Sequence, residues 1–543
     1  MIKLFDIKWS VFLLVLAGIA YAAGLFIDLL EPDSCQYANI SMEMLQKKSF
    51  LQVLYRGENY LDKPPLLFWL SSFSFSVFGI SNFSYRLPSF LFTILGVYSS
   101  YRLASGLYNK KTGQITIIVL VTCQAYFLFN HDVRTDTLLT GSVIFSIWQL
   151  YEFLNKNKIK NLILGFAGIG LAMLSKGPIG IVIPILAFAP DFIYRKKWGY
   201  FIKWQWLLGL FILALMLTPM MIGLYKQFGT YGLRYYFWIQ SFGRITGENV
   251  WDNNPGALLL PSSFIWAFMP WCILAVYAVF DRLKLIFLEI RNKLPRSEIF
   301  TVSGIVLTFY SLTRSHYQLP HYIFVLFPLF AIVTAATIEK IIISKPKTTR
   351  VFEYTQIIAC SLLWMLTIFL FAYCFPGLHP AIWLLWGIIT VLAILTFFKN
   401  KLASARLIIP SALTIIGINI ILNTHLYPLL LTYQSGSKAS EIIREKKIPM
   451  NRVFMYKSED QTLGFYSRYV FTSLDEKMVS DSILQKKKIW IYTDQKSFDK
   501  LTENLIPSTV YPIDYYHVTK LTTRFINPKT RNKTLSKRYL VEL

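Results

Sequence analysis

Carboxylates stand in three unusual surroundings in the first part of this sequence. Asp33 follows a Glu-Pro pair, Asp62 precedes Lys63 and two prolines, and Asp136 comes two residues after an arginine. A carboxylate can deprotonate or orient an attacking hydroxyl, and a nearby cation can stabilise a phosphate that leaves as an anion. These residue types therefore favour group transfer from a phosphate carrier.

The elements that must position these residues are long apolar runs. The chain has 543 residues, 54% of them hydrophobic and 16% charged, and its mean hydropathy is +0.45. A soluble domain carries about a quarter charged residues, so the composition excludes an ordinary soluble enzyme. A helix of about twenty apolar residues crosses a bilayer, and by this criterion we expect about thirteen spans. They are 9–30, 83–105, 112–130, 136–154, 160–174, 177–194, 205–226, 257–280, 298–313, 321–339, 354–375, 380–398 and 405–425.

The charges of the connectors indicate how these spans are oriented. With a cytoplasmic N-terminus, the connectors on the cytoplasmic side are all rich in Lys or Arg, as short inner loops usually are. The outer connectors are sparse in both. This pattern accounts for much of the formal net charge of +25 without a nucleic-acid partner. The basic connectors are 109–111, 156–160, 195–203, 282–296, 340–350 and 399–406.

Two long outer loops, 31–82 and 227–256, are expected to carry the chemistry. Within the first loop, the run Pro65 to Phe78 is too short to span and is expected to lie along the membrane interface. Charged side chains at the outer ends of several spans would then converge on one cavity.

Four cations belong to this outer face, where the topology rule disfavours positive charge: Lys63, Lys176, Arg244 and Arg314. An isolated Lys or Arg at such a place usually reaches towards lipid headgroups. Four of them on one face indicate an anionic partner, for which phosphate is the natural candidate.

A different composition begins near residue 426, where charges appear every few residues. Alternating patterns at 452–456 and 488–492 predict strands, and Ser437 predicts a capped helix start. We therefore expect a transmembrane domain at 1–425 and a small α/β domain at 426–543. Because the N-terminus is expected in the cytoplasm, an odd number of spans would place this second domain on the outer, periplasmic face of the membrane.

The motifs named above follow one another along the chain in an order that is typical of one protein family. The sequence resembles the bacterial integral-membrane glycosyltransferases of the protein O-mannosyltransferase and aminoarabinose–lipid A transferase group, which have the GT-C fold. The shared features are an acidic motif after the first helix, an acidic-Lys-Pro-Pro box, an Arg-x-Asp segment, a Lys-Gly-Pro turn and the element from Tyr322 to Pro328.

The resemblance implies roles for single residues. Two departures from the family pattern are Ser34, where a second acidic residue is common, and Asp62, where Glu is common. Both bear on metal use and on the acceptor. The implied roles are catalysis for Asp33 and Asp136, donor-phosphate binding for Lys63, Arg244 and Tyr322, and help in holding a divalent metal for Asp62.

The resemblance also implies an activity: inverting transfer of a sugar from a polyprenyl (undecaprenyl) phosphate donor, without a nucleotide cofactor. The expected acceptor is lipid A or another glycolipid at the periplasmic face of a bacterial inner membrane. A protein acceptor is the alternative within this class. A lipid or sugar transporter or flippase and a non-catalytic membrane scaffold are the alternatives from other classes. The transporter is disfavoured because the acidic residues cluster at the outer ends of spans and no internal repeat is found. The scaffold is disfavoured because it has no use for an acidic-Lys-Pro-Pro box opposite an Arg-bearing loop.

Overall fold

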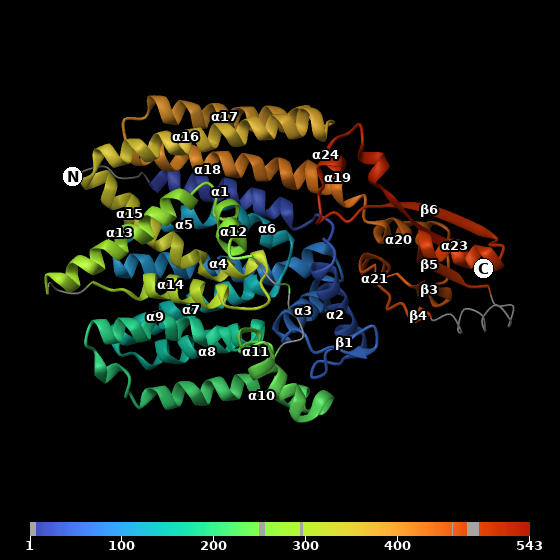
Figure 1. The fold of residues 1–543 in the computed structure, drawn as a ribbon, viewed down its shortest axis with the longest axis horizontal. Coiled ribbons are helices and arrows are strands. Elements are labelled where there is room, and N and C mark those ends of the chain that lie inside the picture. The colour runs from blue at the N-terminus through green and yellow to red at the C-terminus, as the bar shows by residue number, and fades with distance from the viewer. Residues whose placement is uncertain (1–6, 249–252, 254–255, 294–296, 459, 475–487) are drawn as a thin grey trace.

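A computed structural model describes residues 7–248, 253, 256–293, 297–458, 460–474 and 488–543. A body of long, roughly parallel helices carries a small region of strands and short helices at one end, and the N-terminal helix starts at the opposite end (Figure 1). The expected mainly helical fold is confirmed at this level.

The helices of the body precede almost all of the strands in the chain. A short hairpin, β1 (Leu54–Tyr55) and β2 (Glu58–Asn59), interrupts them in the first outer loop. The helices are α1 (Ile7–Gly24), α2 (Asp33–Lys47), α3 (Leu66–Phe78), α4 (Asn82–Leu107), α5 (Lys110–Val121), α6 (Gln124–His131), α7 (Thr135–Lys156), α8 (Ile159–Lys176), α9 (Ile179–Tyr194), α10 (Gln205–Arg234), α11 (Gly243–Thr246), α12 (Leu259–Ala267), α13 (Cys272–Arg291), α14 (Phe300–Thr313), α15 (Phe327–Ser344), α16 (Pro346–Phe369), α17 (Pro380–Lys399), α18 (Ala403–Ile421) and α19 (Tyr427–Leu431).

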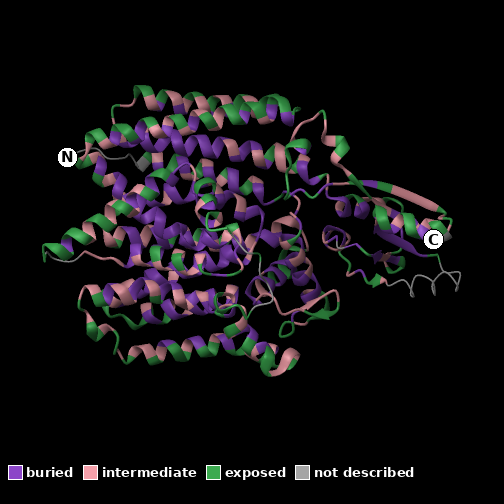
Figure 2. Cartoon of the chain, viewed as in Figure 1, coloured by how far each residue is buried: buried purple, intermediate pink, exposed green. Residues whose placement is uncertain are grey.

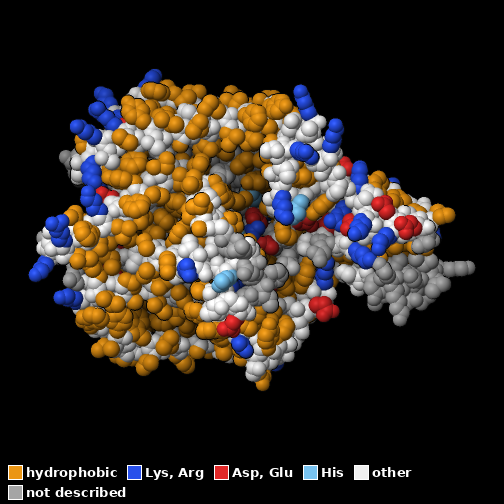
Figure 3. Space-filling view, in the orientation of Figure 1, with side chains coloured by type: hydrophobic (Ala, Val, Ile, Leu, Met, Phe, Trp, Pro, Cys, Tyr) orange, Lys and Arg blue, Asp and Glu red, His pale blue; other side chains and the backbone are white. Residues whose placement is uncertain are grey.

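Every predicted span falls on a helix or on a pair of helices. Among the described residues, six helices are long and apolar enough to cross a membrane, or eight if each of two bent pairs is one span. The bent pairs are α5 with α6 and α12 with α13. The number of thirteen spans therefore stays a prediction. Figure 3 shows hydrophobic side chains over the middle of the body and Lys and Arg side chains near both ends, as a bilayer requires.

One segment of the outer loops agrees with its predicted limits and another differs. The run after the two prolines forms α3, which has 13 residues and is, as predicted, too short for a perpendicular span. The second outer loop was expected from residue 227; α10 is kinked at Gly229, but helix resumes to Arg234 and the π-helical turn η2 (Tyr235–Ile239) follows it. This loop is therefore largely helical where it is described.

The chain after residue 450 forms a five-stranded sheet in the order β4-β3-β5-β7-β6. The strands β3, β4 and β5 are parallel to one another, whereas β7 is antiparallel to both β5 and β6. The two predicted strands are β3 and β5, but α20 begins at Ser435 rather than after Ser437. The elements are β3 (Val453–Tyr456), β4 (Ser473–Leu474), β5 (Trp490–Asp494), β6 (Thr509–Tyr515) and β7 (Ser536–Glu542), with α20 (Ser435–Glu445), α21 (Thr462–Ser467), α23 (Gln495–Asn504) and α24 (Thr523–Ile526).

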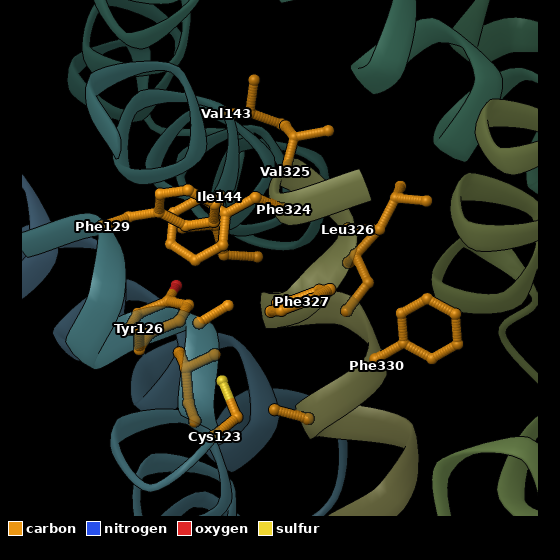
Figure 4. Close-up of a cluster of buried hydrophobic side chains, with 14 of the residues drawn as sticks. Cys123, Tyr126, Phe129, Val143, Ile144, Phe324, Val325, Leu326, Phe327 and Phe330 are labelled. Carbon is orange, nitrogen blue, oxygen red and sulfur yellow. The ribbon is translucent and has the colours of Figure 1, made fainter. Parts of the chain in front are cut away.

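Buried residues run through the interior of the helical body (Figure 2). One cluster packs α6 against the 3-10 turn η3 (Pro320–Leu326) and the start of α15 (Figure 4). The ring of Phe324 lies 4.8 Å from that of Tyr126 and 4.7 Å from that of Phe129. Aromatic pairs at such separations stabilise the packing of the two elements to which they belong. α6 and η3 therefore form a rigid base for the polar groups at their outer ends.

Candidate functional site

A carboxylate–arginine–carboxylate chain lies at the start of α2. Arg134 Nη1 donates to Asp33 Oδ2 at 2.5 Å, and Arg134 Nε donates to Asp132 Oδ2 at 2.9 Å. Burial acts to lower the pKa of Arg134, but the two carboxylates hold it above its usual value. The side chain of Asp33 keeps 34% of its exposure and that of Asp132 only 7%. The Asp33 carboxylate is thus held by Arg134 on one side and exposed on the other.

The loop before Asp33 is held by Arg86, which is fully buried in α4. Its guanidinium donates only to backbone carbonyls, and these come from both sides of the site: Leu25, Ile27, Asp28 and His131. A guanidinium is suited to this task because its donors form a fixed planar fork. Arg86 therefore joins the end of α6, which precedes Asp132, to the segment that leads to Asp33.

The C-terminal region holds the same loop from the other side. The Gln434 side chain donates to Leu29 O and accepts from Glu31 N, and the Glu31 carboxyl accepts from the backbone N–H groups of Gln461 and Thr462. Burial, together with Asp460, raises the pKa of Glu31 well above its usual value. We infer that Glu31 keeps the proton that it shares with Asp460.

A second ion pair lies at the start of α7, two residues after Arg134. Asp136 is buried in the first turn of α7, and its Oδ1 lies 2.5 Å from Lys176 Nζ at the end of α8. His321 Nε2 of η3 lies 3.8 Å from Asp136 Oδ2. Only 3% of the Asp136 side chain is exposed. Its carboxylate is therefore enclosed and faces Lys176 and His321.

The acidic-Lys-Pro-Pro box contributes the pair of Asp62 and Lys63, whose Oδ2 and Nζ atoms are 2.7 Å apart. Gln240 donates to Asp62 Oδ1 at 3.1 Å and also contacts the Asp62 carbonyl. Burial acts to raise the pKa of Asp62, but Lys63, Arg244 and the Gln240 hydrogen bond outweigh it, and the pKa lies below its usual value. This carboxylate is therefore ionised at neutral pH.

Arg244, from α11, is a cation that has a hydrogen-bond donor without a partner. Its Nη1 donates to the Tyr322 hydroxyl at 2.6 Å, and its guanidinium lies over the Tyr317 ring at 5.4 Å. Arg244 Nε is buried without a hydrogen-bond partner. No carboxylate pairs with Arg244 in the described part of the chain. A buried guanidinium in this state favours an anionic ligand.

These cations line one cavity of about 130 Å³. Lys63, Lys176, Arg244 and Tyr322 contribute its polar part. Its apolar walls come from one face of α9 and from the end of α14, with Ile179, Val182, Ile183, Leu186, Thr308 and Leu312. The cavity thus has a charged part and an apolar part between α9 and α14, which we call the apolar groove; together they match a ligand with a phosphate head and a hydrocarbon tail.

The structure brings together most of the residues expected from the sequence. Lys63, Arg244 and Tyr322 line the cavity, whereas Asp33 and Asp136 do not. Asp136 pairs with the lining residue Lys176, and Asp33 pairs with Arg134, which also lies outside the lining. Arg314 was expected to join the other cations, but it is exposed and lies outside the cavity lining.

Sequence reasoning missed several residues that shape the site. Arg134 was visible only as part of a motif, and Gln240 carries no signal of its own because its partner is 178 residues away. His321, next to Tyr322, could have been proposed from the same segment. Each of these residues acts by contacting a charged side chain that comes from another element.

The metal expected at Asp62 has little support from its surroundings. Over the described residues, no group of three or more His, Cys, Asp or Glu side chains lies close enough to hold a metal ion. Lys63 and Gln240 already engage the Asp62 carboxylate. The donor set does not fit a protein-bound metal, and a metal at Asp62 stays a prediction.

Comparisons with known proteins agree with the resemblance to membrane glycosyltransferases that the motifs indicate. The family model "Dolichyl-phosphate-mannose-protein mannosyltransferase" matches residues 62–222. The undecaprenyl phosphate-alpha-4-amino-4-deoxy-L-arabinose arabinosyl transferase of Wigglesworthia glossinidia brevipalpis is 28% identical over 347 residues, which cover 62% of this chain and 60% of the relative. Such an enzyme from Pseudomonas fluorescens is 25% identical over 63% of this chain and 59% of its own length. The chain therefore aligns with about three fifths of these relatives.

The crystal structure of ArnT from Cupriavidus metallidurans bound to undecaprenyl phosphate superposes with a TM-score of 0.75, at 15% identity, over 99% of this chain and 98% of that one. The chain has the ArnT fold. The apo structure of the same protein gives a TM-score of 0.76. The ArnT fold extends through the C-terminal region as well as the helical body, because the superposition covers nearly the whole of both chains. The resemblance to the ArnT-like GT-C group, predicted from the order of the motifs, is confirmed.

Proposed function

We propose that this protein is a membrane glycosyltransferase that moves a sugar from an undecaprenyl-phosphate-linked donor to an acceptor at the outer face of the membrane. The observation that carries the proposal is the cavity with Lys63, Lys176 and Arg244 at its polar part and an apolar groove beyond them. The names of the relatives add the donor class, since they are transferases of an undecaprenyl-phosphate-linked sugar.

The donor would bind with its phosphate at the three cations. Lys176 and Lys63 each have a carboxylate partner, so Arg244 is the group whose charge a phosphate would neutralise. The first part of the polyprenyl chain would lie between α9 and α14, where Val182, Ile183 and Leu312 offer apolar contacts. The rest of the chain would extend into the surrounding lipid.

In the transfer step, an acceptor oxygen forms a bond to the anomeric carbon while the bond from that carbon to the phosphate oxygen breaks. The bonding electrons leave with the phosphate, which becomes a monoester with one more negative charge. The cations act most strongly at this moment because the leaving group gains charge in the transition state. Attack from the side opposite the phosphate inverts the anomeric centre.

Asp33 and Asp136 take different roles in this scheme. Asp33 has an open side and a charged partner, so it would accept the proton of a hydroxyl acceptor, or orient an acceptor that is already ionised. Asp136 is closed off by Lys176 and His321. We therefore assign Asp136 to the placement of Lys176, as a positioning residue.

Lipid A is the first acceptor to test, because the motifs resemble those of the aminoarabinose–lipid A transferase group, the matched relatives are named as 4-amino-4-deoxy-L-arabinose transferases, and the overall fold is that of ArnT. A protein acceptor is the second, because the matching family model is named for protein mannosylation. In both cases the connector charges predict that the N-terminus lies in the cytoplasm and that the site lies on the opposite face of the membrane. The resemblance to bacterial members of the family implies that this membrane is a bacterial inner membrane and this face the periplasmic one.

The test is transfer of labelled sugar by the purified protein in lipid. Several undecaprenyl-phosphate-linked sugars are offered with lipid A and, in parallel, with a Ser/Thr-rich protein. Label in one acceptor with the wild type, and none with Asp33→Asn, supports the proposal and names the acceptor class.

The matched control is Glu58→Gln, an exposed carboxylate of the same outer loop. It should transfer label at the wild-type rate. No label in either acceptor from a folded wild-type protein, or full activity of Asp33→Asn, would overturn the proposal and shift weight to transport.

A further inference from the structure

A larger cavity, separate from the donor site, lies where the C-terminal region meets the helical body. Its volume is about 770 Å³. The turn between α3 and α4 lines one side, and the end of α20 and the helix α21 line the other. It shares no lining residue with the donor cavity.

Three cations line this junction cavity: Arg444 and Lys447 at the end of α20, and Arg468 just after α21. All three are exposed, and in the described part of the chain no carboxylate forms an ion pair with any of them. The Ser467 hydroxyl, also in the lining, is buried and has no hydrogen-bond partner. Three unpaired cations beside an unused donor form an anion-binding arrangement.

A simpler explanation is that cations near the C-terminal ends of helices interact with the helix dipole. That explanation accounts for one cation at each helix end. It does not account for the convergence of three cations from two helices on one cavity, nor for the buried Ser467 hydroxyl. Lys and Arg side chains also gather around this junction in Figure 3.

The position of the cavity identifies the source of the anion. The turn at Ile80–Asn82, which forms its body-side wall, separates α3 from α4. Beside this turn, Phe78 is 58% exposed and Phe26 is 67% exposed, and both rings pack on Phe83. Exposed apolar rings at the end of an apolar helix form a surface that lipid can cover. The cations therefore lie near exposed aromatic groups that acyl chains can contact.

We propose that the junction cavity binds the phosphate headgroup of an anionic phospholipid in the outer leaflet. Arg444, Lys447 and Arg468 bind the phosphate, and the acyl chains lie along the exposed faces of Phe26 and Phe78. A bound lipid fixes the C-terminal region to the membrane surface. Because the site shares no residue with the donor cavity, its occupancy does not depend on the proposed function.

Lipid binding to the delipidated full-length protein, measured by native mass spectrometry in a neutral detergent, tests this proposal. Phosphatidylglycerol is the anionic probe, phosphatidylcholine the zwitterionic one and inorganic phosphate the headgroup without a lipid. A cation near an anionic membrane surface contributes about 1 kcal/mol. The combined Arg444→Gln, Lys447→Gln and Arg468→Gln variant should therefore lose about 100-fold in phosphatidylglycerol affinity.

The matched control removes three exposed cations elsewhere in the C-terminal region, with Lys496→Gln, Lys500→Gln and Lys520→Gln. It has the same net charge as the test variant and should bind phosphatidylglycerol like the wild type. The single variants are measured too, and each should lose several-fold while melting at the wild-type temperature.

Three results would overturn the proposal. The first is equal phosphatidylglycerol affinity in the wild type and the triple variant. The second is an equal loss in the control variant, which would mean that only total charge matters. The third is displacement of the lipid by an equal concentration of inorganic phosphate, which would make this a site for small anions.

Discussion

The substitution Arg244→Gln tests the donor site most sharply, because this guanidinium has no carboxylate partner among the described residues and an unused buried Nε atom. Glutamine keeps a donor for the Tyr322 hydroxyl but removes the charge. A hydrogen bond to a charged group contributes about 1.5–3 kcal/mol. Since about 1.4 kcal/mol corresponds to a factor of ten, kcat/KM for the donor should fall by about 10- to 150-fold.

The assay is initial-rate transfer of labelled sugar over a range of donor concentrations in a fixed lipid composition. Arg314→Gln serves as the control, since Arg314 is an exposed cation outside the cavity lining. It should stay within about twofold of the wild type. If Arg244→Gln were as active as Arg314→Gln, with both folded, Arg244 would not bind the phosphate and the reasoning from its unpaired charge would fail.

Three further predictions concern the surroundings of the site. Arg134→Gln frees Asp33, so kcat should fall about 100-fold while KM for the donor is unchanged; a rise in KM alone would contradict the assignment. Val182→Trp narrows the apolar groove and should raise KM for a full-length undecaprenyl donor more than for a short-chain analogue, whereas equal effects on both would argue against a polyprenyl chain there. Because the folded pKa of Glu31 lies above its unfolded value, its stabilisation is present at low pH and is lost as the pH rises. The melting temperature of the wild type should therefore fall as the pH rises above the ordinary glutamate pKa of about 4.3. That of Glu31→Gln, which mimics the protonated form, should fall less; parallel curves would contradict this.

The fold was predictable from the sequence where the signal is local. Apolar length placed a helix at each predicted span, and period-two alternation found β3 and β5. The order of the sheet was not predictable, because β5 pairs with residues of β7 that lie 44 to 52 positions further along the chain, and no local pattern encodes that choice. The start of α20 at Ser435 was not predicted either. Gln434 precedes the helix without a side-chain cap, and Ser437, which was expected to cap it, lies inside it.

The site was predictable only in part, for the same reason. Lys63, Arg244 and Tyr322 were found because motifs or the topology rule marked them. The partnership of Arg134 with Asp33 joins residues 101 positions apart, and that of Glu31 with Thr462 joins residues 431 apart. Such contacts depend on how helices pack against one another and on where the C-terminal region docks. A single sequence holds no direct record of either.

The most direct measurement is photo-crosslinking of the purified protein with an undecaprenyl phosphate analogue that carries a photoreactive group near its phosphate end. Peptide mapping should place the label on 179–186 of α9 or 308–312 of α14, and excess undecaprenyl phosphate should suppress it. Label confined to other helices, or label that undecaprenyl phosphate does not compete away, would contradict a polyprenyl phosphate site in this cavity.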